Sequence, residues 1–243
     1  MPKGKISVHT DNLLPIIKKW LYSDCDIFIR ELISNAQDAI MKIKKLSSLG
    51  EVTLQNSDFR IDVEVDKEAS VIKISDNGIG MTEEEVDKYI NQVAFSGAEE
   101  FLKKYENEKD DNGTIIGHFG LGFYSAFMAA TEVEIDTLSY KEGSAAVHWI
   151  SDGGTEYDIN EGTRSERGTT ITLHISDEFK EFLEVYKLKE VIKKYCGFLP
   201  VEIYVKDKSD DSSESSEPIN DTNPLWLKNP VDCTEEEYKE FYH

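Results

Sequence analysis

The chain has 243 residues, which is enough for one large domain or two small ones. Because 39% of them are hydrophobic, the chain can bury a core, and a disordered protein is excluded. It carries 48 acidic and 27 basic residues, a formal net charge of -21. Such a surface repels nucleic acid and anionic membranes, so we expect neither as a partner.

Three cysteines, Cys25, Cys196 and Cys233, lie far apart and form no CxxC pair, which predicts reduced thiols in a cytoplasmic protein. The five histidines are equally scattered, so their spacing predicts no cluster of zinc ligands. The first residues contain no apolar core of the signal-peptide kind, and no stretch reaches the length of a membrane span.

Hydrophobic periodicity predicts the elements of the first half of the chain. In chain order these are a helical region from Asn12 to about Leu46 with a break near Ser23–Asp26, a β-hairpin of Arg60–Val65 and Val71–Ser75, a capped helix at Thr82–Tyr89, and a short helix at Glu99–Tyr105. A polar loop, Glu106–Gly113, follows them.

The second half is richer in strands. Its expected elements are an apolar helix at Phe123–Ala130, strands at Val133–Ser139, Ala145–Ile150 and Thr169–Ile175, an amphipathic helix at Phe179–Tyr195, and a last strand at Val201–Val205. Helices combined with hairpin-linked strands predict an α+β fold in two layers, a mainly antiparallel twisted sheet covered on one face by helices.

A change in composition near the end predicts the domain organisation. Residues 208–222 are rich in Ser, Asp and Glu, which is typical of a linker. We therefore expect one domain over 1–207 and the start of a further, truncated domain over 223–243.

The first candidate for chemistry is a polar seam on the helix Ile27–Leu46. At about 100° per residue, Glu31, Asn35, Asp38 and Lys42 fall on one line at the border of the core. A carboxylate and an amide oxygen one turn apart can serve as a water-activating base and a Mg²⁺ ligand. An ordinary solvated helix face has the same pattern, so the spacing alone leaves both interpretations open.

The second candidate is the sequence SDNGIGM at Ser75–Met81, directly after a predicted strand. Gly78 and Gly80 permit a sharp turn and a close backbone approach. Asp76 at the end of the strand can accept a hydrogen bond from an amino group. Aspartate is also common in plain glycine-rich turns, which is the alternative.

The third candidate is a glycine-rich run, Gly117–Gly122, before the apolar helix that begins at Phe123. Glycines before a helix N-terminus expose backbone N–H groups to an anion, so the run is a possible phosphate cradle. It is neither a Walker A sequence nor a dinucleotide-binding fingerprint. An ordinary connection between two elements is the alternative.

The order of the three candidates resembles the ATP-binding fold of the GHKL ATPase superfamily, the Bergerat-type fold. Longer motifs are similar to one branch, the HtpG-type chaperones of the heat shock protein 90 family. These motifs are RELISNAQDA at 30–39, SDNGIGM at 75–81, IGHFGLGFYSAF at 116–127, and Arg167-Gly168-Thr169. The resemblance extends over nearly the whole chain and implies the N-terminal ATP-binding domain of such a chaperone.

The resemblance implies roles for the candidates. Glu31 would be the general base, Asn35 the protein ligand of Mg²⁺, and Asp76 the acceptor for the adenine amine. The other residues implied in binding ATP or ADP are Asp38, Gly80, Met81, Gly117, His118, Phe119, Gly120, Leu121, Gly122, Phe123 and Thr169, with Lys42, Ser96 and Gly97 less closely matched. The segment Gly97–Gly117 would be a lid over the nucleotide.

Two positions depart from the family pattern. Phe95 stands where the family commonly has a lysine near the phosphates, and His118 replaces the more usual glutamine. The first change removes a positive charge, so the resemblance does not carry that phosphate contact over to this chain.

By the same resemblance, ATP would close the lid and drive N-terminal dimerisation in a homodimer that remodels client proteins. Hydrolysis by this chain alone would be slow, because the family places an assisting arginine in a middle domain. Two other functions stay possible: the catalytic domain of a histidine kinase, which Glu31 disfavours, and an interaction module that binds no nucleotide.

Overall fold

The structure is a computed structural model, and it describes residues 24–54, 58–92, 97–105, 115–117, 120–209, 217–229, 233–234 and 238–239. The expected helical pattern before Ser23 and the expected loop Glu106–Gly113 lie outside these residues. So do Phe95, Ser96, His118 and Phe119.

The described strands form one seven-stranded sheet in the order β5-β4-β3-β6-β2-β1-β7. The strands are β1 (Arg60–Asp66), β2 (Val71–Asp76), β3 (Ala130–Leu138), β4 (Val147–Ser151), β5 (Asp158–Glu161), β6 (Gly168–Ile175) and β7 (Glu202–Asp207). Strands β1 and β7 pair in parallel, and the other described pairs are antiparallel. This is the mainly antiparallel sheet that the sequence predicts.

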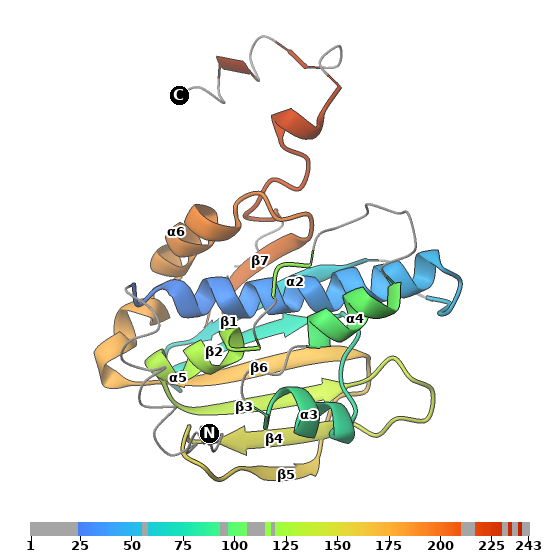
Figure 1. The fold of residues 1–243 in the computed structure, drawn as a ribbon. Coiled ribbons are helices and arrows are strands. Elements are labelled where there is room, and N and C mark those ends of the chain that lie inside the picture. Colours follow the sequence, from blue (N-terminus) through green and yellow to red (C-terminus); the bar gives the residue numbers. More distant parts are fainter. Residues whose placement is uncertain are drawn as a thin grey trace, which may run out of the picture.

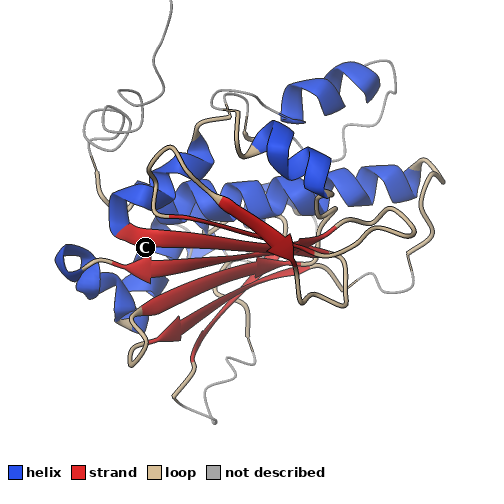
Figure 2. Cartoon of the chain, turned by 90° about the horizontal axis from the view of Figure 1, so that it is seen from below, coloured by secondary structure: helices blue, strands red, loops and turns tan. Residues whose placement is uncertain are grey.

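The helices gather on one side of this sheet (Figures 1 and 2), except the short η3, which lies on the C-terminal segment away from the sheet. They are α2 (Ile27–Ser48), α3 (Glu83–Tyr89), α4 (Gly97–Tyr105), η1 (Gly122–Ser125), α5 (Ala126–Ala129), η2 (Asp177–Leu183), α6 (Val185–Cys196) and η3 (Leu225–Leu227). The long helix α2 runs along the sheet and packs against β1 and β2 (Figure 1). The two-layer α+β fold is confirmed.

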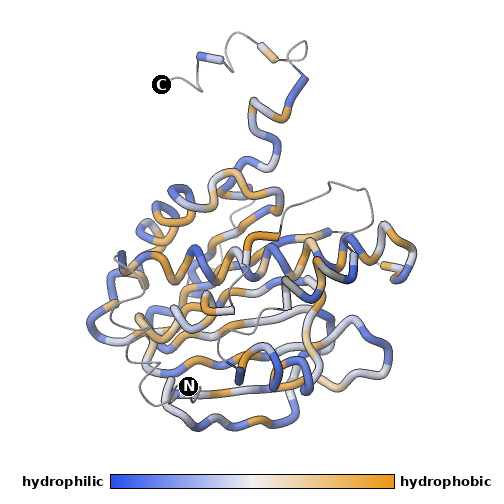
Figure 3. The backbone as a smooth tube through the Cα atoms, viewed as in Figure 1, coloured by the Kyte–Doolittle hydropathy of each residue, from blue (hydrophilic) through white to orange (hydrophobic). Residues whose placement is uncertain are grey.

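The core lies between α2 and the helix-facing side of the sheet. Phe28 and Leu32 of α2 are fully buried, as are Val63 and Ile72 of the hairpin. Hydrophobic and hydrophilic residues alternate along α2 and along the strands in Figure 3, as expected for elements with one buried side. The core therefore holds α2 against β1 and β2, and this placement fixes where the polar seam of α2 lies.

The expected β-hairpin and the capped helix are confirmed. Strand β1 pairs with β2 from Ile61 opposite Asp76 to Asp66 opposite Val71. Helix α3 begins with a capping box, in which the Glu85 N–H donates to the Thr82 hydroxyl and the Thr82 N–H donates to the Glu85 carboxylate.

Two expected helices are wrong in extent. The helix expected at Phe179–Tyr195 is broken, because Glu184 is extended, with φ -83° and ψ 117°, between η2 and α6. The helix expected at Phe123–Ala130 is only the 3₁₀ turn η1 followed by the four-residue α5, and Ala130 already begins β3. Periodicity identified the apolar faces here but not the points at which the backbone turns.

Strand β5 was not predicted. Its sequence, Asp158-Ile159-Asn160-Glu161, is polar, and the strand lies at the edge of the sheet with most of its side chains exposed. An edge strand of this kind has little apolar alternation to reveal it. Its pairing with β4, with Trp149 opposite Ile159, is what places it in the sheet.

Part of the expected linker contacts the domain. The Asn220 side chain is buried, accepts a hydrogen bond from the Ile203 N–H at 2.8 Å, and donates to the carbonyls of Leu199 and Val201. The Ile219 N–H donates to the Ile203 carbonyl at 2.8 Å. The domain boundaries stay predictions, but 219–220 are bonded to β7. No helix among the described residues is long and apolar enough to cross a membrane.

Candidate functional site

A cavity of about 390 Å³ lies between α2, α3, α4 and the helix-facing side of β2, β3 and β6. Twelve of the residues predicted for nucleotide binding line it: Asn35, Asp38, Lys42, Asp76, Gly80, Met81, Gly97, Gly117, Gly120, Gly122, Phe123 and Thr169. Glu31 and Leu121 are not among the lining residues. The structure thus brings most of the three candidate motifs to one place.

The loop after β2 touches both α2 and β3. A Cβ atom on Gly78 would lie 2.5 Å from the Ala39 carbonyl carbon, and one on Gly80 would lie 1.9 Å from the Leu138 carbonyl oxygen. Gly80 also has φ +62°, which favours glycine. The Ile79 N–H donates to the Ala39 carbonyl at 3.0 Å, which fixes the loop against the helix.

Two arginines hold the same loop from the other side. Arg164 donates to the Asp76 carbonyl at 3.2 Å and also bonds the Thr170 hydroxyl. Arg167 donates to the Asn77 carbonyl and, at 3.1 Å, to the Gly78 carbonyl. Arg167 belongs to a motif that the sequence singled out, and its side chain fixes the backbone of the turn.

Asp76 is a buried carboxylate of the site, with 7% of its surface exposed. Its Oδ1 accepts a hydrogen bond from the Gly78 N–H at 2.7 Å. Burial raises the pKa of Asp76 to about 7, against the opposing effect of hydrogen bonds from the Gly78 and Thr169 N–H groups and of the charges on Arg164 and Arg167. The carboxyl is therefore poised between its neutral and its charged form near neutral pH.

Thr137 is a site residue that the sequence did not reveal. Its fully buried hydroxyl accepts from the Met81 N–H at 2.9 Å and lies 3.0 Å from the Thr169 hydroxyl. It thereby connects the loop after β2 to β6. The sequence feature that could have identified Thr137 is a polar residue at an inward-facing position of β3, where Val133 and Ile135 precede it in the same alternation.

Asp38 binds the start of the glycine-rich segment. Its two carboxylate oxygens accept from the N–H groups of Ile116 and Gly117, at 2.9 and 2.7 Å. A Cβ on Gly117 would lie 3.1 Å from Asp38 Oδ2 and 3.5 Å from Asn35 Oδ1. Asp38 thus positions the segment, and the amide oxygen of Asn35 lies beside it.

Glu31 lies next to the second part of the segment. Arg30 holds its Oε1 through Nε at 3.0 Å and through a second, shorter contact. A Cβ on Gly122 would lie 2.6 Å from the Glu31 Oε2. The Glu31 carboxylate therefore lies next to Gly122, where Arg30 holds it, and does not line the cavity.

The short η1 and α5 correct one expectation about the glycine-rich loop. A phosphate site at a helix N-terminus draws on a helix dipole, whose strength depends on several aligned turns. Here Gly122 begins a 3₁₀ turn of only four residues, followed by four α-helical residues. The Gly117 N–H already donates to Asp38, so anion binding here would depend on the individual N–H groups of Gly120 and Gly122.

Helix α4 covers the cavity from the side of the expected lid. Glu100 accepts from Lys88 Nζ at 2.7 Å and from the Tyr89 hydroxyl at 3.0 Å, which ties α4 to α3. At its other end the Tyr105 hydroxyl donates to Glu51 at 2.9 Å, next to the end of α2. Phe101 and Lys104 of α4 line the cavity.

Lys42 completes the predicted polar seam and lines the cavity. Burial lowers the pKa of its ammonium group, and the charges of Asp38 and Glu85 oppose that shift. The lining contains four acids, Asp38, Asp76, Glu85 and Glu100, and two bases, Lys42 and Lys104. The cavity is thus not basic in itself.

Comparison with known proteins agrees with this geometry. Residues 22–180 match the family described as "Histidine kinase-, DNA gyrase B-, and HSP90-like ATPase". The match covers more than half of the chain, and the chain belongs to this ATPase family.

Within the family, the chain is similar to the HSP90-type chaperones. It is 50% identical to "Chaperone protein HtpG" of Porphyromonas gingivalis over 99% of this chain, and 51% identical to that of Bacteroides fragilis over 100% of it. It is 44% identical to that of Fusobacterium nucleatum over 96% of it. The chain spans 36% or 37% of the length of these relatives. The resemblance carried by the motifs is confirmed.

The close approach at Gly80 leads to a stability prediction. Gly80→Ala would place a methyl group against the Leu138 carbonyl, whereas Gly143, with φ +77°, has nothing within 4 Å of an added Cβ. We expect Gly143→Ala to cost about 1–2 kcal/mol from backbone strain alone, and Gly80→Ala to cost roughly 1–3 kcal/mol more from overpacking. Urea unfolding of both variants measures the difference, and equal losses would contradict the clash.

The raised pKa of Asp76 leads to a pH prediction. The pKa of Asp76 is about 7 in the folded state, and its ordinary value, in the unfolded state, is about 3.9. Between these two pH values the folded state keeps a proton that the unfolded state has lost. This carboxyl therefore makes stability fall across that window, on the order of 2 kcal/mol between pH 5 and pH 7. Urea unfolding of the wild type and Asp76→Asn across this range isolates the effect. Parallel curves would refute it.

Proposed function

We propose that this chain binds ATP and ADP with Mg²⁺ in the cavity and hydrolyses ATP slowly, as the nucleotide-binding domain of an HtpG-type chaperone. The observation that carries the proposal is the buried Asp76 carboxylate on the cavity wall, at the position where the family motif places the acceptor for the adenine amine. The carboxylate accepts from the Gly78 N–H and has acceptor sites left for a further donor, which an exocyclic amine offers.

The adenine end of the cavity is built from Asp76, Thr169, Met81 and Phe123. Thr169 lies opposite Asp76 in the β2–β6 pairing, and its hydroxyl lies 3.0 Å from that of Thr137. Met81 and Phe123 supply apolar surface for a flat ring. The cavity volume is in the range of ordinary ligand pockets.

The phosphate end consists of Asn35, Lys42 and the glycines at 117, 120 and 122. A nucleotide brings several negative charges to a wall with more acids than bases, so its binding needs a divalent cation. The Asn35 amide oxygen, beside Gly117, is a suitable hard ligand. Mg²⁺ bound there with the phosphates would neutralise charge on the γ-phosphate during its transfer.

Glu31 acts as the general base in this proposal. Arg30 fixes one carboxylate oxygen, while the other lies beside Gly122, at the end of the phosphate segment. From this position Glu31 orients a water molecule and accepts its proton as the water attacks the γ-phosphate. The absence of Glu31 from the cavity lining fits a base that works at the edge of the phosphate end rather than on the adenine.

The rest of the cycle belongs to the longer chaperones. Closure of the lid over 97–117, dimerisation of N-terminal domains, and remodelling of client proteins are proposed here on the similarity to HtpG chaperones, of which this chain spans 36%. In the structure, α4 is bonded to α3 through Glu100 and to the end of α2 through Tyr105, and these bonds would have to change when the lid moves.

The binding step is tested by calorimetric titration with Mg²⁺·ADP, which avoids turnover. We expect one nucleotide per wild-type chain and a loss of at least tenfold in affinity with Asp76→Asn. The uncharged amide replaces one acceptor oxygen of the carboxylate by an NH₂ group, which weakens the hydrogen bond from the adenine amine. Asp62→Asn, on the opposite face of the sheet, is the matched control and leaves binding unchanged. If the wild type binds no nucleotide, the remaining interpretation is an interaction module that does not bind ATP.

The catalytic step is tested with Glu31→Gln. We expect ADP affinity within about twofold of the wild type and ATP turnover lower by roughly 10²–10⁴-fold, the usual contribution of a general base. Phosphate release under single-turnover conditions measures it, with Glu142→Gln, an exposed residue, as the control. Unchanged turnover would remove the base role, and phosphate transfer to a histidine without hydrolysis would favour the kinase alternative.

A further inference from the structure

The helix-free face of the sheet carries a row of carboxylates and imidazoles. Glu132, Glu134 and Asp136 alternate along β3, and they share this face with His148 of β4 and His174 of β6. We call these five residues the carboxylate–histidine row. The strand register places Glu132 opposite His174 and Asp136 opposite His148, with Glu134 between the two pairs.

A β-bulge sets this register. The pairing of β3 with β6 shifts between Ala130 and Glu132, so that one extra residue, Thr131, is accommodated before Glu132 meets His174. The Thr131 hydroxyl donates to the His174 carbonyl at 3.2 Å. Without the bulge the side chains of the row would point to the other face of the sheet.

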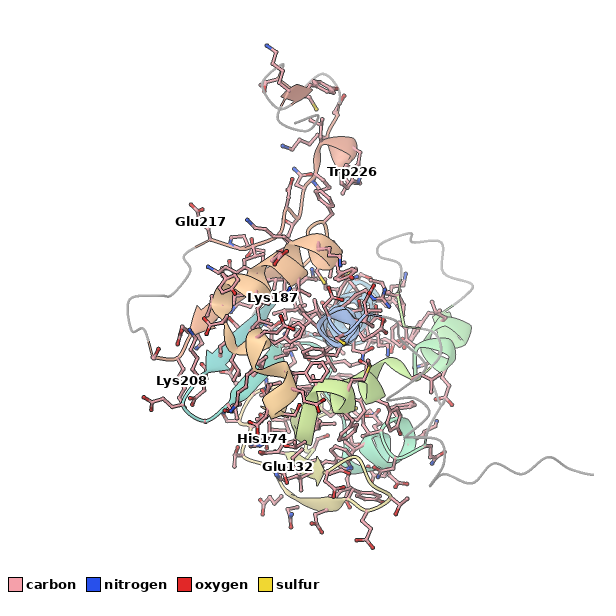
Figure 4. All side chains as sticks on the ribbon, turned by 90° about the vertical axis from the view of Figure 1, so that its left-hand side faces the viewer. Glu132, His174, Lys187, Lys208, Glu217 and Trp226 are labelled. Carbon is pink, nitrogen blue, oxygen red and sulfur yellow. The ribbon has the colours of Figure 1, made fainter. Side chains whose placement is uncertain are left out.

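At one end of the row, two carboxylates approach the same imidazole nitrogen. His174 Nε2 lies 2.6 Å from Glu134 Oε1 and 3.7 Å from Glu132 Oε1. The three ligand atoms of this group lie within 4.8 Å of one another. Glu132 and His174 are labelled in Figure 4, where they lie close together at the surface.

At the other end, the carboxylates approach different nitrogens. Asp136 Oδ2 lies 3.2 Å from His148 Nδ1, whereas Glu134 Oε2 lies 3.8 Å from His148 Nε2. A single nitrogen of His148 therefore does not face both acids. A metal ion needs one nitrogen lone pair directed between its carboxylate ligands, so Glu132, Glu134 and His174 are the better ligand set.

We propose that Glu132, Glu134 and His174 bind a divalent transition-metal ion of the Zn²⁺ type. Imidazole nitrogen and carboxylate oxygens are ligands that Zn²⁺ accepts together, whereas Mg²⁺ and Ca²⁺ prefer oxygen alone. Three protein ligands leave at least one position for water. The three carboxylates of β3 repel one another on one face, and a bound cation reduces this repulsion.

The distances fit such a site after small movements. Metal–ligand bonds of about 2.0–2.2 Å in a tetrahedral site place neighbouring ligand atoms roughly 3.3 Å apart. The pair at 2.6 Å must open and the pair at 3.7 Å must close, each by less than about 1 Å, and the two carboxylate oxygens, which lie within 4.8 Å, must come into the same range. The side chains of Glu132 and His174 are 44% and 35% exposed, so they have room to adjust.

The proposed metal site is separate from the nucleotide cavity. Ile135 of β3 and Thr169 and Ile171 of β6 line the cavity, while Glu134 and His174 lie on the opposite face of the same two strands. The site therefore does not depend on the proposed function. Nucleotide affinity also serves as a check that a variant of the metal site is folded.

The test is calorimetric titration of the chain with ZnCl₂ in the presence of millimolar Mg²⁺ and without nucleotide. We expect about one Zn²⁺ per chain, because three ligands form one complete set. His174→Ala and Glu134→Gln should each lower Zn²⁺ affinity by at least tenfold while leaving Mg²⁺·ADP affinity within twofold. Zn²⁺ affinity equal to that of the wild type in His174→Ala overturns the proposal.

Three control variants distinguish other sources of binding. Glu64→Gln removes one carboxylate from the same face, on β1, and His148→Ala removes the other imidazole. Each should keep the affinity within about threefold. Cys25→Ser/Cys233→Ser removes two thiols that could hold zinc and should also bind as the wild type does. If any of these variants loses Zn²⁺ binding while His174→Ala retains it, the zinc ion binds outside the proposed site.

Discussion

The contact between the loop after β2 and helix α2 determines much of this structure. Gly78 meets the backbone of Ala39 and Gly80 meets Leu138, at distances that no side chain with a Cβ would allow. This contact brings the end of β2, the middle of α2 and the end of β3 together. Asp76 lies at the point where they meet, so its burial and its raised pKa both follow from the packing of two glycines.

Features that depend on local geometry could be predicted from the sequence. The polar seam of α2 follows from helical periodicity, and the cavity lining includes three of its four members, Asn35, Asp38 and Lys42. The turn around Gly78 and Gly80 and the capping box at Thr82 are also encoded in a few neighbouring residues. Family motifs then joined these pieces into one site, which their separate spacings left open.

Features that depend on strand register could not be predicted. Thr137 joins the site because β3 pairs with β6, which places it beside Thr169. Scattered histidines predicted no metal ligands, yet His148 lies opposite Asp136 and His174 opposite Glu132. The one-residue bulge at Thr131 places Glu132 opposite His174, and the alternation of apolar and polar residues along β3 does not reveal this bulge.

The acidic composition acts differently on the two faces of the sheet. Around the cavity each carboxylate has its own donor: the Gly78 N–H for Asp76, two backbone N–H groups for Asp38, and Arg30 for Glu31. These acids already accept hydrogen bonds and offer no positive charge, so an anionic ligand there must bring its own cation. On the helix-free face the acids of β3 meet imidazoles, whose nitrogens can bind a metal ion together with the carboxylates. The two proposed cation sites would thus differ in their ligands, with oxygen alone inside and one nitrogen outside, in a chain of net charge -21.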